Sequence, residues 1–161
     1  MRFNTTDITY YNQPFDHWVL DNFLDKNDAK KLSNQFIDYD NPTEEIIHYK
    51  GWIGEKRTCN RWDRFPPLTY STFSSLLSNK FINKLSDITG ITPLYPDIGL
   101  HGGGWHMSGK GGSLAMHLDY SIHPKMNLQR KLNLIIYLEE DYNPEWGGSL
   151  QFWSHDEENK K

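Results

Sequence analysis

The chain has 161 residues, enough for one folded domain. Its 17 Lys and Arg against 21 Asp and Glu give a net charge of −4, which argues against a nucleic acid partner because phosphate binding depends on clustered positive charge. The single Cys excludes an internal disulfide, and the N-terminus has no apolar run typical of a leader or membrane span, so we expect a cytoplasmic protein without a membrane partner.

The first predicted elements are a strand and a helix. Residues 15–25 alternate large apolar and polar side chains, which favours a short strand. Residues 25–40 have apolar side chains close to helical spacing, among them Leu32, and this predicts an amphipathic helix. Asp25 or Asn27 is suited to cap its N-terminus.

A second helix is predicted after a long irregular region. Residues 41–70 are polar and interrupted by proline, which is typical of loops. Residues 70–90 then predict one amphipathic helix, and Gly90 is suited to end it. The apolar side of that helix comprises Leu76, Leu77, Phe81 and Leu85.

Short strands are predicted beyond Gly90, where turn residues multiply and helical spacing disappears. These β-type runs are residues 98–101, 113–119, 131–138 and 148–153. Within 131–138 the odd positions Asn133, Ile135 and Tyr137 share one face, and the even positions carry Leu or Ile. We expect a sheet whose apolar face packs on the helices and whose second face lines a cleft. Helices followed by strands indicate the α+β class.

His117 and Asp119 are the candidate metal ligands. On a strand, residues two apart project from the same face, while Leu114, Met116 and Leu118 would face packing. An imidazole and a carboxylate suit a divalent iron site that keeps positions open for cosubstrate and dioxygen. A two-residue pattern is weak by itself, and an ordinary surface pair is the alternative.

The sequence around this pair resembles a known family. The stretch "HLDYSIHPKMNLQRKLNLIIYLEEDYNPEWGGSLQFW" has His117-x-Asp119, a loop ending at Arg130, an apolar strand and then Gly147-Gly148. It is similar to the iron(II)/2-oxoglutarate dioxygenases, in particular their prolyl-4-hydroxylase-like branch. The resemblance covers residues 98–153 and, more loosely, 14–40.

The resemblance implies a fold and a domain organisation. The fold would be a double-stranded β-helix, a jelly-roll or cupin-like barrel, with supporting helices at the N-terminus and incomplete at the C-terminus. Residues 1–161 would form one domain, with a helical lead-in over 1–97 and the first barrel strands over 98–153.

The resemblance also implies the site. His117 and Asp119 would be iron ligands and the catalytic residues, and Tyr137 would bind the distal carboxylate of 2-oxoglutarate, with Asn133 on the same face. Leu150 and Phe152 would line or back the pocket. Simple packing of Tyr137 at a sheet edge, and of Leu150 and Phe152 in the core, are the alternatives. The expected cofactors are Fe(II) and 2-oxoglutarate, with ascorbate a further option.

The activity implied is hydroxylation of an unactivated C–H bond with dioxygen, on a peptidyl, prolyl or small-molecule substrate. The family also needs a second histidine ligand and a basic residue for 2-oxoglutarate, which we expect beyond Lys161, because His155 lies too near the Gly-Gly turn. We therefore expect a piece of a longer protein.

Two alternatives to the iron enzyme stay open. The first is a non-catalytic or degenerate β-barrel binding module. The second is a zinc-binding cupin-like enzyme, which would need His101 or His106 as a further ligand. His123 precedes a proline, which favours extended backbone, and we expect it in a loop and not at the metal.

Overall fold

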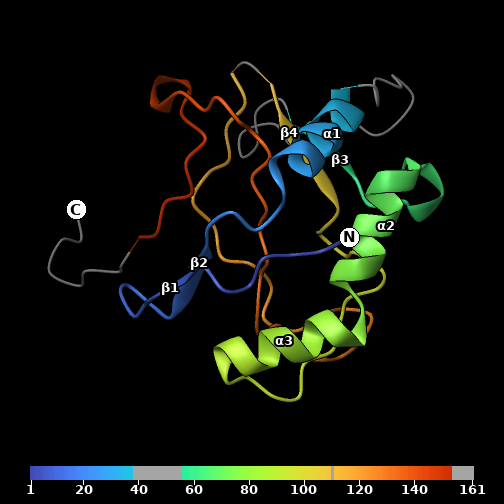
Figure 1. Cartoon of the computed structure of the whole chain (residues 1–161). Helices are drawn as coiled ribbons and strands as arrows, with labels where there is room; N and C mark the ends of the chain where they lie inside the picture. Colours follow the sequence, from blue (N-terminus) through green and yellow to red (C-terminus); the bar gives the residue numbers. More distant parts are fainter. Residues whose placement is uncertain (38–55, 110, 154–161) are drawn as a thin grey trace, which may run out of the picture.

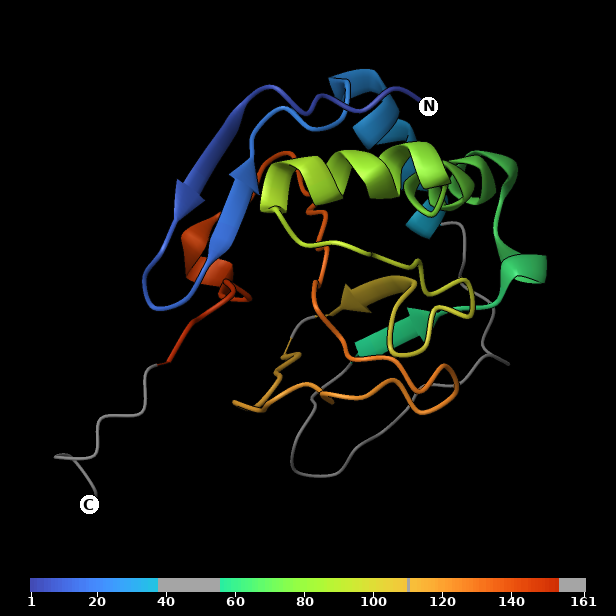
Figure 2. The ribbon, with the colours of Figure 1, turned by 90° about the horizontal axis from the view of Figure 1, so that it is seen from below.

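A computed structural model of the chain describes residues 1–37, 56–109 and 111–153. In chain order its elements are β1 (Ile8–Tyr11), β2 (His17–Leu20), α1 (Lys26–Ile37), β3 (Lys56–Cys59), the 3-10 turn η1 (Trp62–Arg64), α2 (Pro67–Leu76), α3 (Asn79–Thr89), β4 (Trp105–Ser108) and the 3-10 turn η2 (Pro144–Trp146). The helices lie on one side of the β3–β4 ribbon (Figure 2). The predicted α+β class is confirmed.

The first two strands form an antiparallel hairpin at one end of the molecule (Figure 1). Tyr10 pairs with Trp18 across it, and their rings lie 5.4 Å apart. The strand predicted over 15–25 is confirmed for His17–Leu20, and it ends there because Asn22 adopts a left-handed backbone with φ 51°. β1 was not predicted.

Helix α1 begins where the sequence predicts. The Asp25 carboxylate accepts a hydrogen bond from the Asn27 backbone N–H at 2.9 Å, so Asp25 caps the helix. Leu32 is 2% exposed and anchors α1 to the core. The predicted end of this helix, residues 38–40, lies outside the described residues.

The single helix predicted over 70–90 is wrong, because the structure has two helices there. Pro67 starts α2 three residues earlier than predicted. Proline is tolerated at this first position because the N–H that it lacks would have no hydrogen-bond partner within the helix. The chain then breaks, and the Ser78 hydroxyl accepts from the Phe81 N–H at 3.4 Å as the cap of α3. Gly90 ends α3 with φ 71°, as predicted. Leu76 and Phe81 are buried on either side of the break.

Strand β3 lies in the region predicted to be irregular, and it pairs antiparallel with β4. Cys59 pairs with Trp105 at one end of this ribbon. Cys59 also belongs to the core cluster with Phe65 and Leu100, and the residues packed around the cluster are Trp62, Phe73, Leu77 and Trp105. The core therefore joins the β3–β4 ribbon to α2 through aromatic side chains.

The four strands predicted after Gly90 are wrong. Residues 98–101, 113–119, 131–138 and 148–153 form no strands, and the described residues make two two-stranded sheets without a barrel. A strand requires hydrogen bonds to a neighbour, and side-chain alternation alone does not supply that neighbour. Leu118 is 97% exposed, so the expectation that this face enters packing is also wrong.

Part of the expected side-chain alternation is present without a sheet. Leu132, Ile136 and Leu138 are half-buried, whereas Asn133 and Tyr137 are exposed.

None of the helices in the described part of the chain is long and apolar enough to cross a membrane.

Candidate functional site

The His117 and Asp119 side chains lie next to each other. The imidazole Nε2 is 3.5 Å from the carboxylate Oδ1, and the two side chains are 39% and 46% exposed. Residues 113–119 form no strand, so this proximity is a local one between residues two apart and does not depend on a sheet.

The orientation of the His117 ring is fixed by its other nitrogen. Nδ1 lies 2.8 Å from the carbonyl oxygen of Ala115. A carbonyl only accepts hydrogen bonds, so Nδ1 carries a proton and donates it. In the neutral ring, Nε2 then bears a lone pair that faces a carboxylate oxygen of Asp119. A cation near both atoms, either a proton on Nε2 or a metal ion, would be stabilised by this arrangement.

The donor atoms fit two neighbouring positions of a metal ion. Ligands at metal–nitrogen and metal–oxygen distances of about 2.1 Å, set at right angles, lie about 3 Å apart. A small inward movement of either side chain brings the 3.5 Å separation to that value. The residues described hold no group of three or more His, Cys, Asp or Glu placed to bind a metal. Within the described residues, His117 and Asp119 could therefore offer a metal ion two donor atoms and no third.

The second carboxylate oxygen of Asp119 is held by other residues. Arg130 Nη2 lies 3.2 Å from Oδ2, and Asn133 Nδ2 lies 3.5 Å from the same oxygen. Burial lowers the pKa of Lys56, and the nearby Asp119 carboxylate partly offsets that decrease. Asp119 therefore presents Oδ1 to His117, while the Arg130 guanidinium and the Asn133 amide contact Oδ2.

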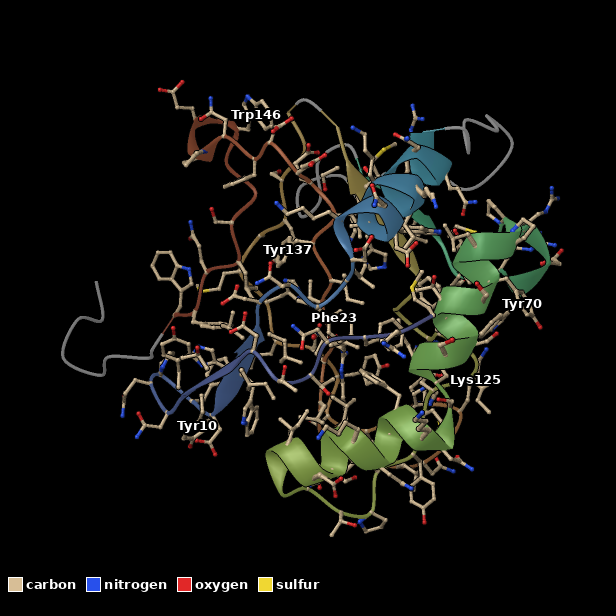
Figure 3. The ribbon with its side chains drawn as sticks, in the orientation of Figure 1. Tyr10, Phe23, Tyr70, Lys125, Tyr137 and Trp146 are labelled. Atoms are coloured by element: carbon tan, nitrogen blue, oxygen red, sulfur yellow. The ribbon has the colours of Figure 1, made fainter. Side chains whose placement is uncertain are left out.

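The structure does not bring every expected site residue to this pair. Asn133 joins it through Asp119, but Tyr137 is 64% exposed and Leu150 is 53% exposed. Burial, followed by the neighbouring Tyr142, raises the pKa of Tyr137. Figure 3 shows Tyr137 well away from Lys125, and Lys125 lies at the tip of the 121–130 segment. Phe152 packs its ring 4.6 Å from Phe15 and covers the β1–β2 hairpin.

Among the described residues, no other histidine forms a three-ligand group with the pair. His123 is in a loop, as expected, and it is buried. The His101 ring lies 5.3 Å from the His123 ring. Burial, together with the Lys56 charge, lowers the pKa of His106 on β4. Neither His101 nor His106 forms a three-ligand group with His117 and Asp119 in the described part of the chain, as the zinc alternative requires. His155 lies outside the described residues.

Two residues near Asp119 were not expected at the site. Lys56 lies in a region that was predicted to be irregular, and its pairing with β4 has no local signal in the sequence. The sequence places Arg130 at the end of a loop and assigns it no contact. A basic residue that follows a His-x-Asp pair is nevertheless a signal, because its side chain could reach the Asp carboxylate.

The comparisons with known proteins agree with the resemblance at a coarse level. A family model described as the 2OG-Fe(II) oxygenase superfamily matches residues 103–161, which include His117, Asp119, Arg130 and Asn133. This match supports an oxygenase of that superfamily, and it does not distinguish the prolyl-4-hydroxylase-like branch. No curated protein and no solved structure matches the chain.

Proposed function

We propose that this chain contributes the first two metal ligands of an iron(II)- and 2-oxoglutarate-dependent dioxygenase that hydroxylates an unactivated C–H bond. The observation that carries the proposal is the apposition of His117 Nε2 and Asp119 Oδ1 at 3.5 Å, with the proton of the imidazole held on Nδ1 by Ala115. The family match over 103–161 supports the same chemistry.

His117 and Asp119 would hold the iron through Nε2 and Oδ1. This donor set is part of the two-histidine, one-carboxylate arrangement of non-haem iron oxygenases. The described residues hold no third His, Cys, Asp or Glu grouped with the pair as a further ligand. When bound, iron(II) with 2-oxoglutarate and dioxygen supplies the oxidising power, so that the substrate is hydroxylated and 2-oxoglutarate yields succinate and carbon dioxide.

The protein's own contribution is orientation of the ligands and of the cosubstrate. Arg130 and Asn133 keep Oδ2 of Asp119 occupied, so that Oδ1 remains directed at His117. We assign Tyr137 to the distal carboxylate of 2-oxoglutarate, and Leu150 to the apolar wall beside it. The resemblance to the dioxygenase family supports both assignments, and the arrangement of residues 131–138 and 148–153, which form no strands, does not. A prolyl or other peptidyl substrate, or a small molecule, is compatible with the proposal.

Metal binding by the full chain tests the ligand assignment. Mn(II) replaces iron(II) in such sites without oxidising, and paramagnetic resonance of the unbound ion measures its affinity. We expect His117→Ala and Asp119→Ala each to weaken binding by at least about tenfold. His17→Ala removes an imidazole from β2 and serves as the matched control. Equal binding by wild type and His117→Ala would contradict the assignment.

Succinate release tests the reaction separately. With iron(II), 2-oxoglutarate and dioxygen present, we expect release that disappears in His117→Ala and Asp119→Ala. Release that survives in either variant would overturn the proposed site. Metal binding without any succinate release would favour the alternative of a non-catalytic binding module.

A further inference from the structure

His123 is a buried histidine in a segment that is otherwise exposed. Its residue is 7% exposed, whereas Ile122 is 55% and Leu128 is 41% exposed. The ring Nδ1 lies 3.2 Å from the Lys125 backbone nitrogen and 3.0 Å from the Met126 backbone nitrogen. Both backbone groups donate, so Nδ1 accepts and bears no proton. A neutral His123 therefore carries its proton on Nε2.

The Nε2 atom of His123 faces Asp97. It lies 3.3 Å from Asp97 Oδ1, yet it is buried and forms no well-aligned hydrogen bond with a described residue. The other oxygen of Asp97, Oδ2, accepts from the His101 backbone N–H at 2.6 Å. A buried polar atom without an aligned partner is costly, so its position against a carboxylate calls for a role. The contact joins residues 97–101 to the loop that contains His123.

The loop that contains His123 is a hairpin over residues 121–130. Ile122 and Gln129 form an isolated antiparallel bridge, and the Arg130 N–H donates to the Ser121 carbonyl at 2.8 Å. His123 itself donates from its backbone N–H to the Leu128 carbonyl at 2.8 Å. In both views the hairpin, in orange, lies beside the yellow segment that follows α3 (Figures 1 and 2).

The base of this hairpin leads directly to the candidate metal pair. The Arg130 guanidinium carbon lies 4.7 Å above the centre of the Tyr120 ring, and Nη2 reaches Asp119 Oδ2 at 3.2 Å. The Tyr120 hydroxyl donates to the His101 carbonyl at 2.8 Å. The same turn, residues 97–101, thus receives His123 from the tip side of the hairpin and Tyr120 from its base. A guanidinium held on both its flat face and its edge has one preferred position.

We propose that His123 is a positioning residue for the candidate site. Through the contact of its Nε2 with Asp97 Oδ1 at 3.3 Å, it holds the hairpin 121–130 on residues 97–101, and the hairpin in turn places Arg130 on Asp119. The expected effect of His123 on metal affinity rests on the proposed function. Its effect on the positions of the Arg130 and Tyr120 side chains does not rest on that function, and it can be measured without metal.

The position of the proton is tested by long-range proton–nitrogen NMR of the full chain at neutral pH. We expect a proton on Nε2 and none on Nδ1 of the His123 ring. A proton on Nδ1, in any form of the ring, would overturn the proposal, because the Lys125 and Met126 amides would then lose their acceptor.

Substitutions separate the two functions of the ring. His123→Asn keeps an acceptor near the Nδ1 position but loses the donor toward Asp97, whereas His123→Gln places an amide N–H near the Nε2 position. We expect His123→Asn to weaken Mn(II) binding by about tenfold and His123→Gln to restore it to within about threefold of wild type. Asp97→Asn, which keeps an acceptor for the His101 N–H, is expected to behave like His123→Asn. Ile122→Ala is the matched control in the same hairpin. Equal loss in His123→Asn and His123→Gln would contradict a role for the Nε2 proton.

A double-mutant cycle distinguishes positioning from general destabilisation. Arg130→Gln and His123→Asn act through the same contact, so their combined effect on Mn(II) affinity should equal the larger single effect. If the double variant instead lost Mn(II) affinity by the product of the two single losses, the proposal would be overturned. If wild type itself binds no Mn(II), the proposed function fails. The Arg130 Nε–H resonance then decides the positioning claim, which is refuted if that resonance is unchanged in His123→Asn.

Discussion

A β-carbon on Gly104 would overlap the carbonyl oxygen of Cys59, and it would lie 2.9 Å from the α-carbon of Asn60. Gly104 also has φ 101°, a backbone conformation that side chains disfavour. The glycine lets the chain enter β4 directly against the end of β3, and the pairing of Cys59 with Trp105 depends on that approach.

We therefore expect Gly104→Ala to lower the free energy of unfolding by about 3 kcal/mol or more, because backbone has to move. Gly90→Ala is the matched control, since Gly90 has φ 71° but nothing within 4 Å of an added β-carbon. It should cost about 1 kcal/mol, from backbone strain alone. Urea unfolding measures both. Equal losses of unfolding free energy in Gly104→Ala and Gly90→Ala would show that the backbone of Gly104 does not lie tightly against the Cys59 carbonyl.

The helix break gives a second stability prediction. Ser78→Ala removes the side-chain cap from α3, and we expect a loss of about 1 kcal/mol. Ser74→Ala, on the exposed side of α2, should change stability by less than about 0.5 kcal/mol. Urea unfolding followed by circular dichroism compares them. A negligible loss in Ser78→Ala would contradict its role as a cap.

The pH dependence of stability should carry a contribution from His106. Desolvation by neighbouring groups and the Lys56 charge lower its pKa in the folded protein below the ordinary value of 6.5, although the residue is exposed to solvent at the surface of β4. The unfolded chain therefore binds the proton more readily, and stability rises with pH through this range. The contribution is fully present above about 6.5 and is lost as the pH falls toward the lower pKa of the folded state.

We expect His106→Gln to flatten the increase in unfolding free energy between pH 5 and pH 7. Lys56→Met should reduce the slope as well, because it removes the positive charge beside the ring. Urea unfolding at several pH values provides the measurement. A slope that is unchanged in His106→Gln would mean that other groups produce it.

The assignment of Tyr137 predicts a specific kinetic change. Loss of a hydrogen bond to a charged group costs enough to weaken binding about tenfold or more. Tyr137→Phe should therefore raise the KM for 2-oxoglutarate by at least about that factor in a succinate-release assay, while Mn(II) binding stays as in wild type. Tyr95→Phe is the control, because Tyr95 and Tyr137 are both 64% exposed. An unchanged KM would remove Tyr137 from the cosubstrate site.

Local signals predicted the parts of the fold that depend on neighbouring residues. The Asp25 cap and the Gly90 end are set within one helical turn, so the sequence shows them directly. The break before Ser78 was missed because apolar residues continue at helical spacing from Leu76 to Phe81, which hides the cap between them. The strand β3 was missed because its partner β4 lies far along the chain.

The candidate site shows the same division. The proximity of His117 and Asp119 is local, because the two residues are only two positions apart. The contact of Arg130 with Asp119 depends on the hairpin 121–130 and on Tyr120, and a strand pattern contains neither. The expected barrel depends on many distant strand pairings, and no single segment of the sequence specifies them.

Cys59 gives the protein a built-in reporter of its core. It is the only cysteine in the 161-residue chain, and it is 7% exposed within the cluster that joins the β3–β4 ribbon to α2. A thiol reagent can react there only when that cluster opens, and no second thiol contributes to the signal. The labelling rate of the unmodified protein thus measures how often the ribbon separates from the helices, without a dye or an introduced probe.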